Sequence, residues 1–441
     1  MINSPNERKR AVGVGLIGFG TIGRGVVRLL LDRSGSLTKG EEFYLQLRRI
    51  ADLDITTPRG IDLPQGILTT DANEVVEARD IDVVIELIGG IEPARTYILK
   101  ALQAGKGVVT ANKALLAKCG DELFETSERN RAALFFEGSV CGGIPIVRSL
   151  RQGLVANRID SIYGILNGTT NYILTKMTEE DEDFEESLRK AQERGYAEAD
   201  PTLDITGQDA AQKLSILLRI GLGLPCRASD IFCEGIETIT RKDIRYAKEL
   251  GYTIKLLAVA KRTDGGVEAR VHPAMIPSGT LLANVRDEFN AVELVGDAVG
   301  TQVFYGKGAG EMPTASAVVA DVVELAKQKS QGTVAGLGVK PRDETLQGLL
   351  PMDEVKMPYY FRFTVIDRPG VLAEIARLLS REQISIASVI QKVRAEGSTV
   401  PIIMMTHQAL ERAMKTAIKN IDKLPAVKAK TQVIRVEELQ R

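Results

Sequence analysis

The stretch Gly13-Val-Gly-Leu-Ile-Gly18-Phe-Gly20-Thr-Ile-Gly23 decides the fold of the N-terminal part of the chain. It ends an apolar strand expected at Ala11–Gly18 and opens an amphipathic helix, the setting in which a GxGxxG motif binds a dinucleotide. Gly18 permits a tight turn, Gly20 lets the backbone approach a pyrophosphate, and Gly23 lets the helix pack closely. Free N–H groups and the helix dipole then hold the phosphates. We therefore predict a dinucleotide site here, rather than a glycine-rich turn of an unrelated α/β protein.

Apolar runs and helical patterns alternate through the rest of this N-terminal part. The further strands expected are Leu45–Leu53, Val83–Ile88, Gly107–Thr110 and Ala132–Glu137. Strands separated by helices form right-handed βαβ units. The sequence thus predicts an α/β fold with a parallel, Rossmann-type sheet in residues 1–140.

The choice between NAD and NADP stays open at this point. Asp52 and Asp54 follow the second strand and could accept a hydrogen bond from a ribose 2′-hydroxyl, which favours NAD. Arg48, Arg49 and Arg59 lie close by in the sequence and could pair with a 2′-phosphate, which favours NADP.

The composition argues against several classes of protein. With 441 residues the chain is long enough for two or three domains. Its 57 Lys and Arg nearly balance 58 Asp and Glu, so the charge suggests no nucleic-acid or membrane partner. No apolar run reaches about 18 residues, and the polar N-terminus lacks the features of a secretory signal. The four cysteines form no CxxC pair, which favours a reducing cytoplasm over a disulfide frame.

The sequence changes character near Gly142. Helices dominate at first, and the charged stretch Glu179–Glu186 is interpreted as a solvated helix face. A further helix is expected at Gly207–Leu222, with strands at Tyr252–Lys261 and Gly266–Val271. The predicted organisation is a Rossmann-type domain (1–140, completed by 305–330), an α+β substrate and dimerisation domain (141–304), a linker (331–357) and a small C-terminal domain (358–441).

A cluster of carboxylates and one lysine lies between Gly195 and Lys213. Asp209 and Lys213 are four residues apart on the helix expected from Gly207, at the edge of its apolar face, where the pKa of a lysine can be lowered. The spacing alone favours an exposed salt bridge worth about 0.3–0.5 kcal/mol. However, Glu198 and Asp204 crowd the same helix end, which would cost repulsion unless a cation lies between them. A substrate ammonium group would supply that cation.

A second lysine, Lys113, directly follows the short strand Gly107–Thr110. This is the carboxyl edge of the predicted sheet, where ligands of doubly wound folds bind. The alternative is an ordinary surface lysine after a strand.

Taken together, these segments resemble the homoserine dehydrogenase family over residues from about 11 to about 330. The motifs that carry the resemblance are the glycine loop, Ala111-Asn-Lys113-Ala-Leu, Glu137-Gly-Ser-Val140-Cys-Gly142-Gly-Ile144-Pro, Leu166-Asn-Gly168-Thr169-Thr170-Asn171-Tyr172-Ile, and the carboxylate cluster. The tail resembles an ACT domain, with Phe361-Arg-Phe-Thr-Val-Ile-Asp367-Arg-Pro-Gly370-Val-Leu as its first strand, turn and helix start. A βαββαβ fold is implied for it.

The resemblance implies a reaction, the reversible NAD(P)-dependent reduction of aspartate semialdehyde to homoserine in threonine, methionine and isoleucine biosynthesis. Lys213 would be the general acid–base, oriented by Asp209, while Lys113 would contact the cofactor and the substrate. Other residues implied for the cofactor are Gly18, Phe19, Gly20, Thr21, Ile22, Gly23 and Gly308. Those implied for the substrate are Glu198, Asp204, Tyr196, Gly168 and Thr169. A structural Na⁺ site is implied at Glu137, Val140, Gly142 and Ile144, mostly through backbone carbonyls.

The resemblance also implies an amino-acid effector bound to the tail, with threonine as the expected one and isoleucine or another amino acid as the alternative. It further implies a homodimer or homotetramer. We expect a chain that ends near Lys356 to keep activity and lose inhibition. The alternative is a tail retained only for assembly.

Two other functions remain to be weighed. An aspartate semialdehyde dehydrogenase would use Cys141 as nucleophile, but no histidine lies nearby in the sequence, so we interpret Cys141 as a small apolar filler. A non-catalytic NAD(P) and amino-acid sensor would leave the carboxylate–lysine cluster without a purpose.

Overall fold

The structure is a computed structural model that describes residues 9–333, 343, 345–392 and 398–439. The chain folds into two compact units. The first comprises Met1–Asp160, Gln212–Ala228 and Asn290–Glu344, and the second comprises Ser161–Ala211, Ser229–Phe289 and Thr345–Arg441. Each unit contains a large hydrophobic cluster of its own.

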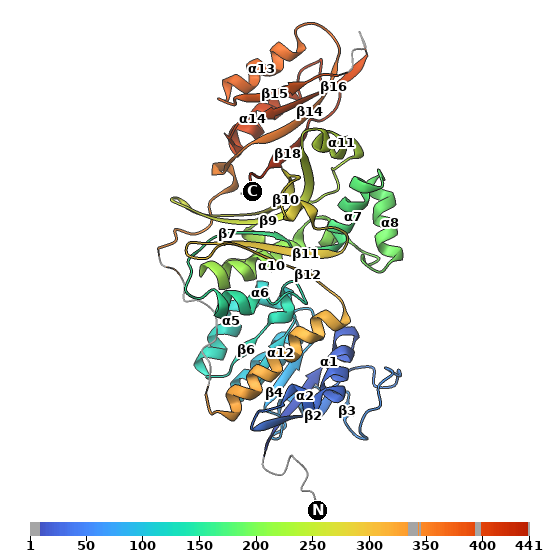
Figure 1. Cartoon of the computed structure of the whole chain (residues 1–441), viewed down its shortest axis with the longest axis vertical. Helices are drawn as coiled ribbons and strands as arrows, with labels where there is room; N and C mark the ends of the chain where they lie inside the picture. Colours follow the sequence, from blue (N-terminus) through green and yellow to red (C-terminus); the bar gives the residue numbers. More distant parts are fainter. Residues whose placement is uncertain (1–8, 334–342, 344, 393–397, 440–441) are drawn as a thin grey trace, which may run out of the picture. The chain divides into compact units, whose positions relative to one another are not determined.

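A six-stranded parallel sheet forms the centre of the first unit (blue to cyan in Figure 1). Its order is β3-β2-β1-β4-β5-β6, made of β1 (Arg10–Ile17), β2 (Phe43–Ala51), β3 (Leu68–Thr69), β4 (Val83–Glu86), β5 (Gly107–Thr110) and β6 (Leu134–Phe135). Residues 12–17 of β1 are all buried, as expected for a parallel strand whose two faces are covered by helices. The predicted Rossmann-type sheet is confirmed.

Helices cover this sheet and connect its strands. They are α1 (Thr21–Asp32), α2 (Ser34–Leu37), α3 (Asn73–Val76), α4 (Ala94–Gln103), α5 (Lys113–Arg129), α6 (Ile146–Arg148) and α12 (Glu311–Ser330), and the hairpin β11 (Phe289–Gly296) and β12 (Gly300–Lys307) leads into α12. Figure 1 shows α12 running beside α1. A Cβ on Gly25 of α1 would lie 3.0 Å from that of Ala315, so the two helices pack in close contact.

The strand β4 is shorter than the expected Val83–Ile88. It ends at Glu86 because the Glu86 carboxylate accepts hydrogen bonds from the N–H groups of Ile88 and Gly89, which turns the chain.

Seven strands of one sheet run through the second unit in the order β7-β9-β10-β18-β14-β16-β15. They are β7 (Ile159–Ile165), β9 (Tyr252–Thr263), β10 (Gly266–Pro277), β14 (Tyr359–Ile366), β15 (Ile386–Ile390), β16 (Thr399–Thr406) and β18 (Gln432–Val436). Short strands are β8 (Phe232–Cys233), which pairs with β10, and the pair β13 (Lys356–Met357) and β17 (Ala409–Leu410). The helices are α7 (Gly168–Glu179), α8 (Phe184–Glu193), α9 (Thr202–Ile205), α11 (Arg241–Glu249), α13 (Val371–Arg381) and α14 (Glu411–Ile421). The helix α10 (Gln208–Leu217) begins in this unit, and from Gln212 onward it belongs to the first unit.

The tail has the expected βαββαβ order, β14-α13-β15-β16-α14-β18. Alternate residues of β14, such as Phe361 and Phe363, pack with Ile375 of α13 and Ile418 of α14 in one core. However, β18 also pairs with a strand outside the tail. It lies antiparallel to β14 on one side and parallel to β10 on the other, so one continuous sheet joins the tail to the β9–β10 hairpin.

The interpretation of the charged stretch Glu179–Glu186 as a solvated helix face is wrong. It is the turn between α7, which ends at Glu179, and α8, which begins at Phe184. Asp183 caps α8 by accepting a hydrogen bond from the N–H of Glu186, and Glu182 is buried. Within the described ranges, no helix combines the length and apolarity that crossing a membrane requires.

Candidate functional site

The glycine loop between β1 and α1 has the backbone shape of a pyrophosphate site. Gly18 has a φ of +102°, and a Cβ there would lie 2.7 Å from the Leu87 backbone. A Cβ on Gly23 would lie 2.1 Å from the Gly18 carbonyl oxygen, whereas one on Gly20 would meet no atom within 4 Å. Gly20 is also the N-cap of α1 and offers no side-chain cap. The first turn of α1 therefore faces open space with N–H groups suited to a phosphate.

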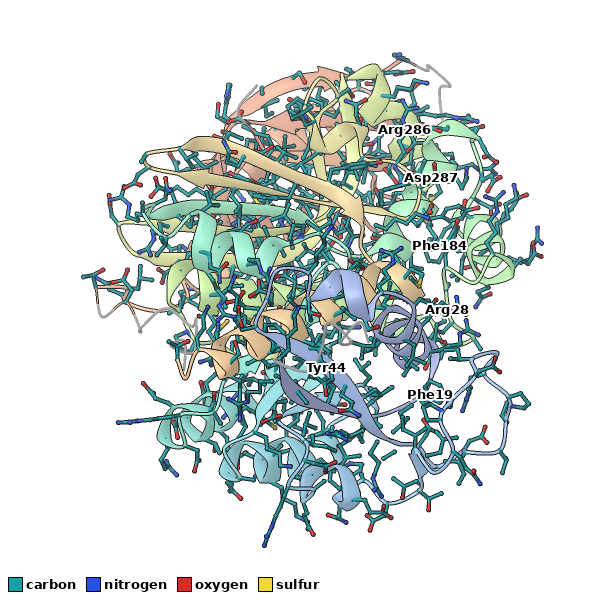
Figure 2. All side chains as sticks on the ribbon, turned by 60° about the horizontal axis from the view of Figure 1, so that its bottom comes forward. Phe19, Arg28, Tyr44, Phe184, Arg286 and Asp287 are labelled. Carbon is teal, nitrogen blue, oxygen red and sulfur yellow. The ribbon has the colours of Figure 1, made fainter. Side chains whose placement is uncertain are left out.

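Three of the residues that could select NAD or NADP, Asp52, Asp54 and Arg59, lie together beside this loop. The other two pair elsewhere, Arg48 with Asp80 and Arg49 with Glu74. Asp52 accepts a 2.5 Å hydrogen bond from the N–H of Phe19, a residue labelled in Figure 2, and Arg59 lies 5.9 Å over the Phe19 ring. Arg59 also contacts both Asp52 and Asp54. Hydrogen bonds from Thr57 hold the pKa of Asp54 well below its usual range. The opposing signals of Asp52, Asp54 and Arg59 thus meet at one place, and the geometry favours neither cofactor.

A polar network at the carboxyl ends of β4 and β5 positions Lys113. The buried Glu86 carboxylate accepts a 2.6 Å hydrogen bond from Thr110, and its burial raises its pKa. Asn112 donates to the Gly90 carbonyl oxygen and caps α5 by accepting from the N–H of residue 115. Lys113 is the first residue of α5, at the sheet edge where it was expected. The sequence-based prediction did not include Glu86 as a site residue, although a carboxylate at the end of a buried strand is a signal that could have identified it.

Two glycine turns, at Gly142 and Gly308, pack directly against each other. A Cβ on Gly142 would lie 2.8 Å from the Gly308 carbonyl oxygen, and the Gly143 N–H donates to Lys307. Cys141 is only 1% exposed and receives a hydrogen bond from the Asn290 amide group at 3.7 Å. These surroundings suit a small buried residue.

The turn from Glu137 to Ile144 offers carbonyl oxygens rather than a cluster of acidic ligands. The Glu137 carboxylate accepts hydrogen bonds from the N–H groups of Val147 and Arg148, so it caps α6. The backbone N–H of Glu137 donates to the Asp321 carboxylate. Burial raises the pKa of Asp321 to about 7. Within the described ranges, no group of three or more His, Cys, Asp or Glu residues could hold a metal ion. Any cation held here would therefore depend on the backbone.

Asn167, in the second unit, joins two of the carboxylates that the sequence analysis singled out. Its amide nitrogen donates to Asp204 at 2.6 Å and to Asp209 at 2.8 Å. Its oxygen caps α7 by accepting from the N–H of Thr170. One amide group thus holds together two carboxylates that would otherwise repel each other. The motif that contains Asn167 contributes to the family resemblance, but the sequence alone does not identify Asn167 as a site residue.

Thr169 and Tyr196 extend this group of residues. The Thr169 hydroxyl donates to the Tyr196 carbonyl oxygen at 2.5 Å, and the rings of Tyr172 and Tyr196 lie 5.0 Å apart. Burial and the nearby Glu288 raise the pKa of Tyr196. Gly168 opens α7 beside them, whereas Glu198 lies exposed in the loop after α8.

Asn171, one turn further along α7, fixes the loop before β11. Its amide donates to the carbonyl oxygens of residues 285, 287 and 289, and Lys255 donates to its oxygen at 2.9 Å. Burial lowers the pKa of Lys255 to about 8. Arg286 and Asp287, both labelled in Figure 2, lie on this loop. Successive turns of α7 therefore hold both the carboxylates and the loop that carries Glu288.

The helix α10 begins one residue after Gly207, as the sequence predicts. Ahead of it, residues 202–205 form one helical turn, α9, where only a loop was expected. Asp209 and Lys213 are 5% and 8% exposed, so the exposed salt bridge favoured by their spacing is wrong. A buried lysine one turn from a pair of carboxylates is suited to moving a proton near a bound cationic substrate.

Comparison with protein families gives three matches. A family model described as homoserine dehydrogenase matches residues 145–323, its NAD binding domain matches residues 18–137, and the ACT domain matches residues 359–426. The homoserine dehydrogenase of Neisseria gonorrhoeae is 43% identical over 98% of this chain and 99% of its own length. That of Bacillus subtilis is 39% identical over 97% and 99%.

Solved structures give the same result. A homoserine dehydrogenase from Thiobacillus denitrificans is 44% identical, with a TM-score of 0.92 over 98% of this chain and 99% of that chain. A hyperthermophilic archaeal homoserine dehydrogenase in complex with NADPH is 26% identical, with a TM-score of 0.61 over 72% of this chain and 98% of that chain.

Proposed function

The chain belongs to the homoserine dehydrogenase family, and from that premise we propose how its residues carry out the reaction. It is an NAD(P)-dependent oxidoreductase that interconverts aspartate semialdehyde and homoserine, with a C-terminal ACT domain. The aspartate semialdehyde dehydrogenase and sensor alternatives are therefore set aside. We keep the division into 1–140 with 305–330, 141–304 and 358–441 as a proposal about which segments serve cofactor, substrate and effector.

We assign the proton transfer to Lys213. The bound nicotinamide supplies the hydride, which forms a C–H bond at the aldehyde carbon. Lys213 donates a proton to the aldehyde oxygen in reduction and removes the hydroxyl proton in oxidation, so charge balances in both directions. Asp209 orients Lys213. Lys113 binds the substrate oxygen, and its positive charge lowers the pKa of Lys213.

The substrate ammonium binds to Asp204 and Glu198, with the other contacts from Tyr196, Gly168 and Thr169. The observation that carries this proposal is the Asn167 amide between Asp204 and Asp209, because it brings two carboxylates close together beside the helix that carries Lys213. At the cofactor end, the backbone of residues 18–23 binds the pyrophosphate, and Gly308 approaches the nicotinamide half.

The experiment measures the reaction rate with homoserine and either NAD or NADP, using the absorbance of the reduced nicotinamide as the readout. It tests the reaction and the cofactor preference together. Lys213→Ala is expected to lower kcat by about 10²–10⁴-fold with cofactor binding retained. The exposed Lys248→Ala on α11 is the matched control and keeps wild-type turnover. A Lys213→Ala enzyme with near wild-type kcat would disprove the assignment.

A monovalent cation, Na⁺, is proposed at the backbone carbonyls of Glu137, Val140, Gly142 and Ile144. The support is chemical: a hard cation of low charge suits carbonyl oxygens, and the Glu137 carboxylate already caps α6. A melting temperature that rises in NaCl relative to choline chloride at equal ionic strength would support the site. An equal melting temperature in both salts would count against it.

Threonine is the proposed effector of the ACT domain. A cavity of about 320 Å³ lies at the turn between β14 and α13, and its lining residues include the polar Asp367, Arg368 and Gln391. These groups can bind the ammonium and carboxylate of a small amino acid. Asp367→Asn is expected to raise the threonine concentration needed for half-inhibition while basal kcat stays unchanged. Unchanged inhibition would move the effector site elsewhere.

The truncation near Lys356 that the sequence suggested is a poor test. It would remove β18, which pairs with β10, and it would remove Glu437, which neutralises the buried Arg270 of β10. Uncompensated buried charge destabilises strongly.

We further propose a homodimer or homotetramer, measurable by sedimentation. A cytoplasmic location is also proposed, since none of the four cysteines is in a disulfide and the reaction uses a nicotinamide cofactor.

A further inference from the structure

A buried arginine of the last strand, Arg435, reaches out of the ACT domain. Its guanidinium binds Glu411 within the domain at 3.0 and 2.5 Å. It also binds Glu234 at 2.7 Å and lies 4.8 Å over the ring of Phe232. Glu234 and Phe232 belong to the segment around β8, which pairs with β10. A single side chain of β18 thus contacts this segment at two residues.

The segment around β8 in turn touches α9, the helical turn that carries Asp204. The Cys233 thiol donates to the Thr206 carbonyl oxygen at 3.2 Å, and the Ile236 N–H donates to the Ile205 carbonyl oxygen at 2.9 Å. A Cβ on Gly235 would lie 2.3 Å from that same Ile205 oxygen. The two segments are therefore packed backbone to backbone, without room for either to shift alone.

Gly207, which follows these residues, has the same lack of room. Gly207 has a φ of +83°, and a Cβ there would lie 3.0 Å from the Cys233 sulfur. Gly207 precedes α10, and Asn167 connects Asp204 to Asp209 on that helix. A displacement of the β8 segment must therefore displace the Asp204 carboxylate or break these contacts.

The two acidic partners of Arg435 differ in what their loss would do. Glu411 is fully buried, so removing its charge would leave Arg435 uncompensated and harm the fold. Glu234 is 35% exposed, and without its charge the Arg435–Glu411 pair remains. Glu234 is thus the part of the connection that can be removed without losing the domain.

We propose that Glu234 is a positioning residue for the substrate, and that its ion pair with Arg435 links the ACT domain to the Asp204 carboxylate. The pair sets the position of residues 204–207, so the affinity for homoserine depends on the state of β18. An effector bound to the ACT domain can then alter substrate binding through this contact. The inference rests on the proposed substrate role of Asp204 and extends it to regulation.

The test compares Glu234→Gln with Glu268→Gln in the full chain. Glu268 also pairs with a buried arginine, Arg270, on the same sheet, but it makes no recorded contact with residues 204–207 in the part of the chain that the structure describes. We expect Glu234→Gln to raise KM for homoserine roughly fivefold, at the low end of couplings between linked sites. KM for NAD(P) and kcat should change less than twofold. Glu268→Gln should leave the homoserine KM unchanged.

A second measurement is the half-inhibiting threonine concentration at subsaturating homoserine, which should rise for Glu234→Gln and not for Glu268→Gln. An unchanged homoserine KM in Glu234→Gln overturns the inference, as does an equal rise in both variants or an equal rise for cofactor and homoserine. If threonine fails to inhibit the wild type, the effector proposal fails, but the KM comparison still decides the positioning role. If Asp204→Asn also leaves KM unchanged, the proposed substrate site itself is wrong.

Discussion

Replacing Asn167 by aspartate changes the group that lies between Asp204 and Asp209 and leaves the size of the side chain nearly the same. In the wild type the amide donates two hydrogen bonds to carboxylates, each worth about 1.5–3 kcal/mol. The introduced carboxyl can donate neither when ionised, and it adds a third negative charge. Taking the lower value for both bonds, the loss is about 3 kcal/mol, or roughly 150-fold in kcat/KM for homoserine.

The cap of α7 separates this effect from general destabilisation. Aspartate caps a helix as well as asparagine, so Asn167→Asp keeps the hydrogen bond to the N–H of Thr170. Asn167→Ala loses the cap as well and should lower the melting temperature further, by an amount that corresponds to about 1 kcal/mol.

The variant should also depend on pH. Three adjacent carboxylates raise the pKa of at least one of them, and a protonated carboxyl can donate a hydrogen bond again. The deficit in kcat/KM should therefore shrink as the pH falls from 8 towards 6. The assay is the initial rate of homoserine oxidation at several pH values, each relative to the wild type. A near wild-type kcat/KM at pH 8 would refute the bridging role of Asn167.

Three further predictions concern the first unit. Gly20→Ala should fold normally and weaken NAD(P)H binding, because its Cβ would enter open space at the proposed phosphate site. Gly18→Ala should instead lower the free energy of unfolding by roughly 1–3 kcal/mol. Fluorescence titration measures the loss of binding, and thermal melting measures the loss of stability. The pKa of Asp321 is raised to about 7 in the folded state, so the folded protein binds more protons and the free energy of unfolding should fall from pH 4 to 7; Asp321→Asn should flatten that decline in urea titrations, and a wild-type pH profile in the variant would contradict the assignment. Cys141→Ser should keep at least half of the wild-type turnover, since no covalent step is assigned to this thiol, and an inactive but folded variant would reopen that question.

The parallel sheet could be predicted because its strands are buried on both faces and therefore appear as continuous apolar runs. β5 matches its expected bounds, Gly107–Thr110, and β1 and β2 are displaced by only one or two residues. The two-residue strand β3 carries no such pattern and was missed. The charged stretch after α7 was misinterpreted because charge alone does not distinguish a helix face from a capped turn.

The candidate site was predictable only in part. Lys113, Asp209 and Lys213 are marked by strand ends and helical spacing, which are local signals. Asn167 is not, because its two carboxylate partners lie 37 and 42 residues away. The contact between Arg435 and Glu234 spans 201 residues, and an arginine on a strand resembles any other in sequence. Long-range polar contacts of this kind depend on the completed sheet, which no local pattern encodes.

The place of β18 limits how regulatory tails can be exchanged among relatives. A chimaera cut in the linker before β14 would bring a foreign β18 against the native β10, and its arginine would have to find the acidic residue of a different β8 segment. Mismatched pairs would leave ionised groups in the interior of the sheet. An engineer who wishes to install a new effector response should therefore transplant β8 and the β9–β10 hairpin together with the tail.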